Sequence, residues 1–336
     1  MHSPSPGRLA ALIVAGVVIL QALMLLAFAW PATNTGPREV PVAVAGPPAA
    51  VEQVEAALGS APSPDEDVAA FEVTAVADQA AATAAIEDRE VYGAVVVTPE
   101  GPRVLVASAA GPAVAQLLRA AAAELSEPGA AAPVEDVVPT TPDDPTGAGL
   151  AAGVLPLVMT SAAGGLIAAV ALRSARLRLA VVTGITVIGG LVSATVLQYA
   201  LGVLDASYVE VAGVTALLIG AVAASVAGLG AVLGRPGAVL GLLVMIFVGN
   251  PLSAAASAPE MLPQPWGEVG QFLPPGAGVS ALRSVAFFDG AAAGMPILVL
   301  SVWLVAGLVL VTLGGMRRRA EPPATSTSAP EVSAGV

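Results

Sequence analysis

The chain has 336 residues, of which 56% are hydrophobic and 11% are charged, and its net charge is −12. Soluble domains are about 25% charged, so this composition and a mean hydropathy of +0.83 exclude a single ordinary soluble domain. All 13 basic residues are Arg, Cys is absent, and His2 is the only histidine. These absences exclude a Walker A loop, a thiolate nucleophile, a disulfide and a histidine-based triad or zinc site. We therefore predict no enzyme, catalytic residue, cofactor or metal site, and the acidic balance predicts no nucleic-acid partner.

Six apolar stretches are each long enough to cross a bilayer core about 30 Å thick. They cover residues 9–30, 149–172, 179–204, 211–233, 237–256 and 295–316. None contains Asp, Glu or Arg, as expected where a charge at the bilayer centre costs about 3 kcal/mol. A cleaved signal peptide is the alternative for residues 9–30, with small residues near Ala27 and Ala29. The length of this stretch and its Trp30-Pro31 ending favour a retained anchor helix.

The distribution of Arg predicts how these stretches are oriented. If the N-terminus is cytoplasmic, eight Arg residues fall in short cytoplasmic segments: Arg8, Arg173, Arg176, Arg178, Arg235, Arg317, Arg318 and Arg319. Only Arg283 then lies in a short outer connection. By the positive-inside rule, we predict a six-helix plasma-membrane protein with cytoplasmic residues 1–8 and a disordered cytoplasmic tail at 317–336.

The long segment after the first stretch predicts a small extracytoplasmic α/β domain at residues 31–127. Strands are expected at 40–46, 71–77, 92–98 and 103–109, and helices at 48–58, 78–88 and 112–127. Five Pro and four acidic residues in 128–148 predict a semi-rigid stalk. Two acidic runs could bind a divalent cation or remain as solvated loop charges: Asp65, Glu66 and Asp67, and Asp143 and Asp144.

The membrane block at residues 149–316 offers two kinds of intramembrane signal. Small residues at four-residue spacing, Gly220, Ala224 and Gly228, predict a helix-packing seam, either to a neighbouring helix or between two copies of the chain. The amides of Gln198 and Asn250 predict interhelical hydrogen bonds or the lining of a substrate path. No carboxylate lies within a stretch, which disfavours an ion-coupled transporter.

The segment at residues 257–294 predicts an outer insertion of two short amphipathic helices. Pro251 ends or bends the preceding stretch, because proline lacks the backbone N–H that a helix needs. The insertion has two interpretations: an outer gate or lipid-contacting lip, or a packed cap over the bundle. The candidate gate residues are Asn250, Pro251, Trp266, Glu268 and Arg283.

Two parts of the sequence carry a resemblance to a known family. They are VPVAVAG at 40–46 with FEVTAVADQAAATAAIEDREVYGAVVVTPEG at 71–101, and GNPLSAAASAPEMLPQPWGEVGQFLPPGAGVSALRSVAFFDG at 249–290. Together with the order of segments, they resemble the ABC-2 type permease superfamily, most closely its YhgE/Pip (phage infection protein) and DUF3533-like membrane proteins. The resemblance implies a membrane transport protein that forms a homodimer or pairs with a similar permease, with a separate cytoplasmic ATPase as a possible partner.

Two functions follow as hypotheses. The first is a permease subunit that exports a hydrophobic or amphipathic compound with energy from a partner protein. The second is a non-transporting envelope scaffold or surface receptor that works through its extracytoplasmic domain on the stalk. In both cases the lipid bilayer is the first partner.

Overall fold

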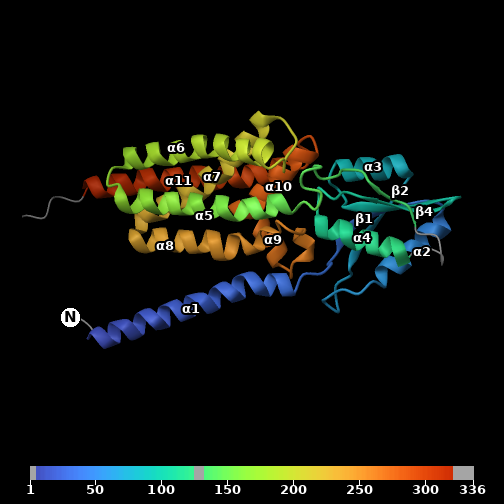
Figure 1. Ribbon diagram of the computed structural model, residues 1–336, viewed down its shortest axis with the longest axis horizontal. Coiled ribbons are helices and arrows are strands. Elements are labelled where there is room, and N and C mark those ends of the chain that lie inside the picture. The colour runs from blue at the N-terminus through green and yellow to red at the C-terminus, as the bar shows by residue number, and fades with distance from the viewer. Residues whose placement is uncertain (1–4, 125–131, 321–336) are drawn as a thin grey trace, which may run out of the picture.

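The computed structural model describes residues 5–124 and 132–320, and it consists of a long helical bundle with a small α/β domain at one end (Figure 1). Among these residues, five helices are long and apolar enough to cross a membrane. They are α1 (Pro6–Thr33), α5 (Ala148–Ala171), α6 (Ala175–Thr195, extended by the π-helix η1, Val196–Ala200), α7 (Tyr208–Leu233) and α11 (Gly294–Ala320). The chain is therefore mostly helical, with several helices suited to a membrane.

The stretch predicted to span residues 237–256 forms a shorter helix than expected. It consists of α8 (Arg235–Leu243) and the π-helix η2 (Val244–Gly249), in all 15 residues or about 22 Å of helix rise. The helix ends at Asn250, whose amide donates to the Met245 carbonyl at 3.1 Å, and Pro251 then starts the short 3-10 helix η3 (Pro251–Ser253). Because Pro251 lacks a backbone N–H, the α-helical pattern does not continue to residue 256.

Helix α7 lies at the centre of the bundle, and α5, α6, α8 and α11 surround it. Its small residues allow close approach to α11. A Cβ atom added to Gly228 would lie 2.6 Å from the Gly307 carbonyl oxygen, and one added to Gly307 would lie 2.6 Å from the Ser225 nitrogen. Gly220 approaches Thr186 of α6 and Leu304 of α11, and Ala224 is fully buried. The residues predicted as a packing seam thus face a helix of the same chain.

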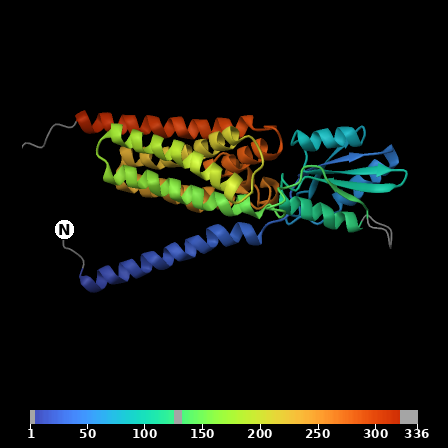
Figure 2. The ribbon, with the colours of Figure 1, turned by 45° about the horizontal axis from the view of Figure 1, so that its top comes forward.

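Helix α1 has a different environment from the other long helices. It lies apart from the bundle in both ribbon views and reaches it only near its C-terminal end, beside η2 and η3 (Figures 1 and 2). Its apolar side chains are exposed along nearly its whole length. Such a surface requires an apolar surrounding such as lipid, because exposing this much apolar area to water costs a large free energy.

The α/β domain contains a five-stranded sheet in the order β2-β1-β3-β4-β5, in which only β3 and β4 pair antiparallel. The strands are β1 (Val40–Ala45), β2 (Phe71–Val76), β3 (Gly93–Thr98), β4 (Gly101–Val106) and β5 (Val134–Asp136). The helices are α2 (Pro48–Gly59), α3 (Gln79–Glu87) and α4 (Pro112–Glu124). The first four strands and three helices follow the predicted order, while residues 125–127 of the last predicted helix lie outside the described residues.

The alternation of β1 explains the two layers of this domain. Val40, Val42 and Val44 pack in the core under α2 and α4, whereas Ala43 and Ala45 pack under α3 on the opposite face. Successive side chains of a strand point to opposite faces of a sheet, so one strand supplies both cores. The alanine face lets α3 lie close to the sheet.

Residues 132–148 differ from the stalk predicted for 128–148, whose first four residues lie outside the described chain. Val134–Asp136 is strand β5, which pairs in parallel with β4. Val137 then donates to the Val106 carbonyl at 2.8 Å, and the hydroxyl of Thr141 donates to the Gly202 carbonyl at 2.6 Å. The Pro-rich segment is therefore held by the sheet edge at one end and by the bundle at the other.

The close approach of α7 and α11 gives a first testable prediction. Gly307→Ala should destabilise the bundle by about 1–3 kcal/mol, because the new methyl group meets the α7 backbone. Gly184→Ala on α6 is the matched control, since a Cβ there meets nothing within 4 Å and should add about 0.4–1 kcal/mol of stability. Melting temperatures in mild detergent would separate the two variants. Equal melting of Gly307→Ala and the wild type would contradict the described packing.

Candidate functional site

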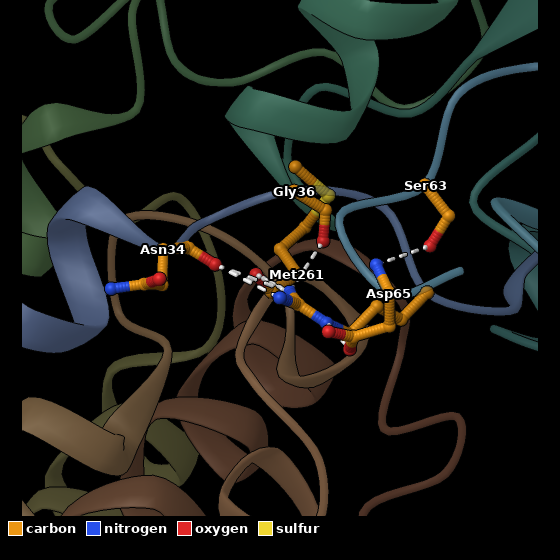
Figure 3. Close-up of polar contacts among 6 residues, drawn as sticks. Asn34, Gly36, Ser63, Asp65 and Met261 are labelled. Carbon is orange, nitrogen blue, oxygen red and sulfur yellow. Dashed lines mark hydrogen bonds and ion pairs between the residues drawn. The ribbon is translucent and has the colours of Figure 1, made fainter. Parts of the chain in front are cut away.

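The junction between the α/β domain and the bundle is built around buried arginines. Arg38 is 3% exposed, and its Nη1 donates to the carbonyls of Asn34, Gly36 and Met261 at 3.1–3.3 Å. Its Nε pairs with Asp65 at 2.5 Å. Figure 3 shows Asn34, Gly36, Asp65 and Met261 gathered at this point. The Arg38 guanidinium thus connects the end of α1, the α/β domain and the segment after η3. It also pairs with Asp65, one of the acidic residues considered above as possible ligands of a divalent cation.

A second arginine fixes α3 to α10 (Pro274–Phe287). Arg89 adopts a left-handed conformation with φ of +60°, and its Nη1 donates to the Ser280 carbonyl at 3.0 Å and to the Ser284 hydroxyl at 2.5 Å. Its guanidinium also lies 5.3 Å from the ring centre of Phe288, within cation–π distance. Burial lowers the pKa of Arg89, while Tyr92 and Glu260 oppose that shift.

A third link joins Tyr92, which precedes β3, to Glu260. The phenol donates to the Glu260 carboxylate at 2.8 Å. Burial raises the pKa of Tyr92, and the charge and hydrogen bond of Glu260 raise it further. The phenol therefore stays protonated and acts as a hydrogen-bond donor to the carboxylate.

Arg283 has a structural position in α10. It is 3% exposed and donates to the carbonyls of Ala255 at 2.7 Å and Ala254 at 3.5 Å. Burial lowers its pKa. Ala254 has φ of +54°, so this guanidinium satisfies carbonyls of an irregular turn where no helix or strand would pair them. Arg283, predicted as a gate residue, holds this turn in place.

The other predicted gate residues do not converge on one cavity. Asn250 is buried and its Nδ2 has no hydrogen-bond partner among the described residues, whereas Pro251 begins η3. Trp266 and Glu268 lie on α9 (Trp266–Gln271), and both side chains are exposed. The insertion thus divides into two parts: α10 is almost wholly buried as a packed cap, and α9 presents exposed apolar side chains at the surface.

A groove of about 600 Å³ lies between α5 and the α6–η1 helix, and we call it the α5/α6 groove. Its lining is mostly apolar and includes Gly149, Ala152, Gly153, Pro156, Leu157, Thr160, Val192, Ser193, Val196, Leu197, Leu201 and Val203, with Asp143 and Asp144 at its domain end. Val192, Val196 and Leu201 are exposed, so the groove is open on the side of the bundle. Asp144 accepts from the Ala148 and Gly149 amides at 3.0 and 2.8 Å and caps α5.

A second hollow of about 970 Å³ lies between the α/β domain and the bundle, and we call it the junction cleft. Four carboxylates line it: Glu87, Asp88, Asp205 and Asp289. None of its lining residues in the described chain is basic. Residues 137–142, which follow β5, form one wall of the junction cleft. The next two residues, Asp143 and Asp144, lie at the end of the α5/α6 groove. The two hollows therefore adjoin the same short piece of chain.

Sequence reasoning missed both hollows. The four cleft carboxylates come from three segments that are far apart in the chain, and only the tertiary fold brings them together. A signal did exist, because Asp144 lies four residues before Ala148, the first residue of α5. Acidic side chains near a helix N-terminus are favoured by the free backbone amides and the helix dipole, and Asp143 and Asp144 also line the mouth of the groove.

A scan against protein-family models found no matching family, and searches of curated proteins and of solved structures found no match to this chain. The geometry of the groove, the cleft and the junction therefore carries the functional argument.

The Tyr92–Glu260 link predicts an alkaline effect on stability. Because folding raises the pKa of Tyr92 above its usual value of about 10, the unfolded chain loses this proton first, and stability falls as pH rises beyond about 10. Tyr92→Phe should reduce that alkaline loss and, at neutral pH, cost about 1.5–3 kcal/mol for the lost bond to a charged group.

Melting temperatures between pH 7 and 11 would test this, with Tyr199→Phe as the control because Tyr199 is largely exposed. The decisive quantity is the difference between the Tyr92→Phe and wild-type curves. Parallel curves across the alkaline range would show that the phenol is not buried against Glu260.

Proposed function

We propose that this chain is an ABC-2-like membrane permease subunit that moves a hydrophobic or amphipathic compound, with energy from a partner protein, across a plasma membrane. The observation that carries the proposal is the α5/α6 groove. It is apolar, it is open on the side of helices of membrane length, and it ends beside the acidic junction cleft. An amphipathic molecule in the bilayer could enter this groove laterally and leave through the cleft.

The course of the chain supports six crossings with both ends cytoplasmic. Helix α7 ends far from the α/β domain, whereas α11 begins near it, so the chain between them must return along the bundle (Figure 1). The 15-residue apolar helix Arg235–Gly249 makes that return. The start of α1, the turn between α5 and α6 and the turn between α7 and α8 then share the end away from the domain (Figure 1). These segments carry Arg8, Arg173, Arg176 and Arg235, as the positive-inside rule expects of cytoplasmic connections.

The lining chemistry supports a preference among amphipathic compounds. Six carboxylates stand along the groove mouth and the cleft: Glu87, Asp88, Asp143, Asp144, Asp205 and Asp289. Carboxylates attract cationic head groups and repel anionic ones, while the apolar groove accommodates a hydrocarbon chain. We therefore propose neutral or cationic amphiphiles as the substrate class.

The junction favours this function over a scaffold that works through a domain on a stalk. Arg38, Arg89 and Tyr92 fasten the α/β domain to the bundle at three places. Strand β5 continues directly into residues 137–144, which border both the junction cleft and the α5/α6 groove. A domain held in this way moves together with α10 and the groove. Transport by one coupled unit fits this geometry better than an independently presented receptor domain.

A groove-filling substitution tests the proposal. Ala152→Trp places an indole in the groove from an exposed position on α5, and Ala171→Trp is the matched control, since Ala171 is exposed on the same helix outside the groove. The measurement is efflux of a single-chain quaternary ammonium amphiphile from the native host cells. Ala152→Trp should lower efflux to about the level of a deletion strain, and Ala171→Trp should leave it near wild type.

A charge substitution tests the preference for cationic compounds. Asp143→Asn should reduce efflux of the cationic amphiphile about fivefold, which corresponds to about 1 kcal/mol of partly screened attraction, and should leave efflux of a neutral amphiphile of equal chain length unchanged.

Wild-type efflux in the Ala152→Trp strain would refute the groove as the transport route.

A further inference from the structure

We propose that a cavity at the end of the bundle away from the α/β domain binds the phosphate headgroup of an anionic phospholipid. The cavity has a volume of about 520 Å³ and lies where the turn between α5 and α6 meets α11. Its lining residues are Arg173, Ser174, Ala175, Arg176, Leu179, Thr312, Gly315 and Met316. We call it the distal cavity, and its role does not depend on the transport function proposed above.

Two guanidiniums in the distal cavity lack a counter-charge. Arg173 and Arg176 are exposed, and neither has a hydrogen bond or an ion pair within the described part of the chain. The described acidic residues of the bundle belong to segments at its α/β-domain end (Figure 1): the connection into α7 with Asp205 and Glu210, η4 (Pro259–Met261) and α9 with Glu260 and Glu268, and the connection from α10 to α11 with Asp289. An anion that balances these two charges must therefore come from outside the described chain.

A third arginine makes this site rigid. Arg178 is 2% exposed, and its Nε and Nη2 donate to the carbonyls of Leu172 at 2.8 Å and Ala169 at 2.7 Å. These bonds fasten the first turn of α6 to the last turn of α5. Because Arg178 is bonded to backbone carbonyls, the turn that carries Arg173 and Arg176 is held in place before any ligand arrives, which reduces the entropy cost of binding.

The chemistry of the cavity selects a phosphate group. Guanidinium groups donate planar pairs of hydrogen bonds that match phosphate oxygens, and two of them on one short turn suit a phosphodiester. The N-terminus of α6 begins at the same turn, and Ser174 makes no side-chain cap there. Its free amides and helix dipole add to the attraction for an anion.

The position of the cavity favours a lipid over a free anion. Leu179 and Met316 form apolar walls on α6 and α11, two helices of membrane-spanning length that end at this level. A phospholipid can place its phosphate on Arg173 and Arg176 while its acyl chain follows these walls. A free phosphate would use the guanidiniums but leave the apolar walls in contact with water.

The test uses the full chain purified in mild detergent, with phosphatidylglycerol and phosphatidylcholine of identical acyl chains as probes. Native mass spectrometry counts retained lipids, and melting temperature reports stabilisation. The wild type should retain phosphatidylglycerol at least about tenfold better than phosphatidylcholine, which corresponds to about 1.4 kcal/mol. The double variant Arg173→Gln, Arg176→Gln should reduce that preference to within about twofold.

The control double variant is Arg8→Gln, Arg235→Gln, which removes the same charge from the same end of the bundle but outside the cavity, and should keep the preference. A second variant, Thr312→Trp, fills the cavity from an exposed position without changing charge, and should also abolish the preference.

Three outcomes would overturn the proposal. Equal loss in both double variants would indicate attraction by net charge alone. Retained preference in Thr312→Trp would show that the cavity does not hold the lipid. Stabilisation of the wild type by inorganic phosphate equal to that by phosphatidylglycerol, and lost in the Arg173→Gln, Arg176→Gln variant, would identify a site for free phosphate instead.

Discussion

The close approach of helix backbones around α7 determines the shape of the bundle. Lipid offers no hydrophobic drive between helices, so the helices associate through dense packing of small side chains. Gly228 and Gly307 bring α7 and α11 together, and Gly165 lets α5 approach the backbone at Ala223. The α5/α6 groove forms where this regular packing changes, because Pro156 removes one backbone hydrogen bond within α5, and α6 continues as the π-helix η1 on the facing wall.

The α/β domain is attached to the bundle by buried polar groups as well as by apolar contacts, in which Met261 and Phe288 enter the two apolar clusters of the domain. A buried charge is costly unless it is paired and hydrogen-bonded, and Arg38 meets this condition with carbonyl and carboxylate partners. Such contacts are directional, so they fix the angle of the domain more strictly than apolar packing would. Because Arg89 bonds to α10 while Thr141 bonds to Gly202 after η1, a shift of the domain would change the groove and the cleft together.

The sequence predicted the features that depend on local pattern. Charge-free stretches located the five long helices, and short apolar runs between turn residues located the first four strands, because both patterns reflect the immediate environment of each residue. It did not predict strand β5, since Val134–Asp136 is short and pairs with β4 only through tertiary structure. The sequence also did not predict which arginines are buried and structural. Arg283 was predicted as a gate residue, and only the fold shows that it donates to two backbone carbonyls.

In this chain, whose basic residues are all Arg, the hydrogen-bond partners of each guanidinium distinguish structural arginines from candidate ligand-binding arginines. Arg178 and Arg283 are buried and donate to backbone carbonyls, so they replace hydrogen bonds that helix ends and turns would otherwise lack. Arg173 and Arg176 lie a few residues away from Arg178, yet they are exposed and have no partner within the described part of the chain. Beside a cavity with apolar walls, two such guanidiniums suit the proposed phospholipid, whose phosphate supplies a negative charge.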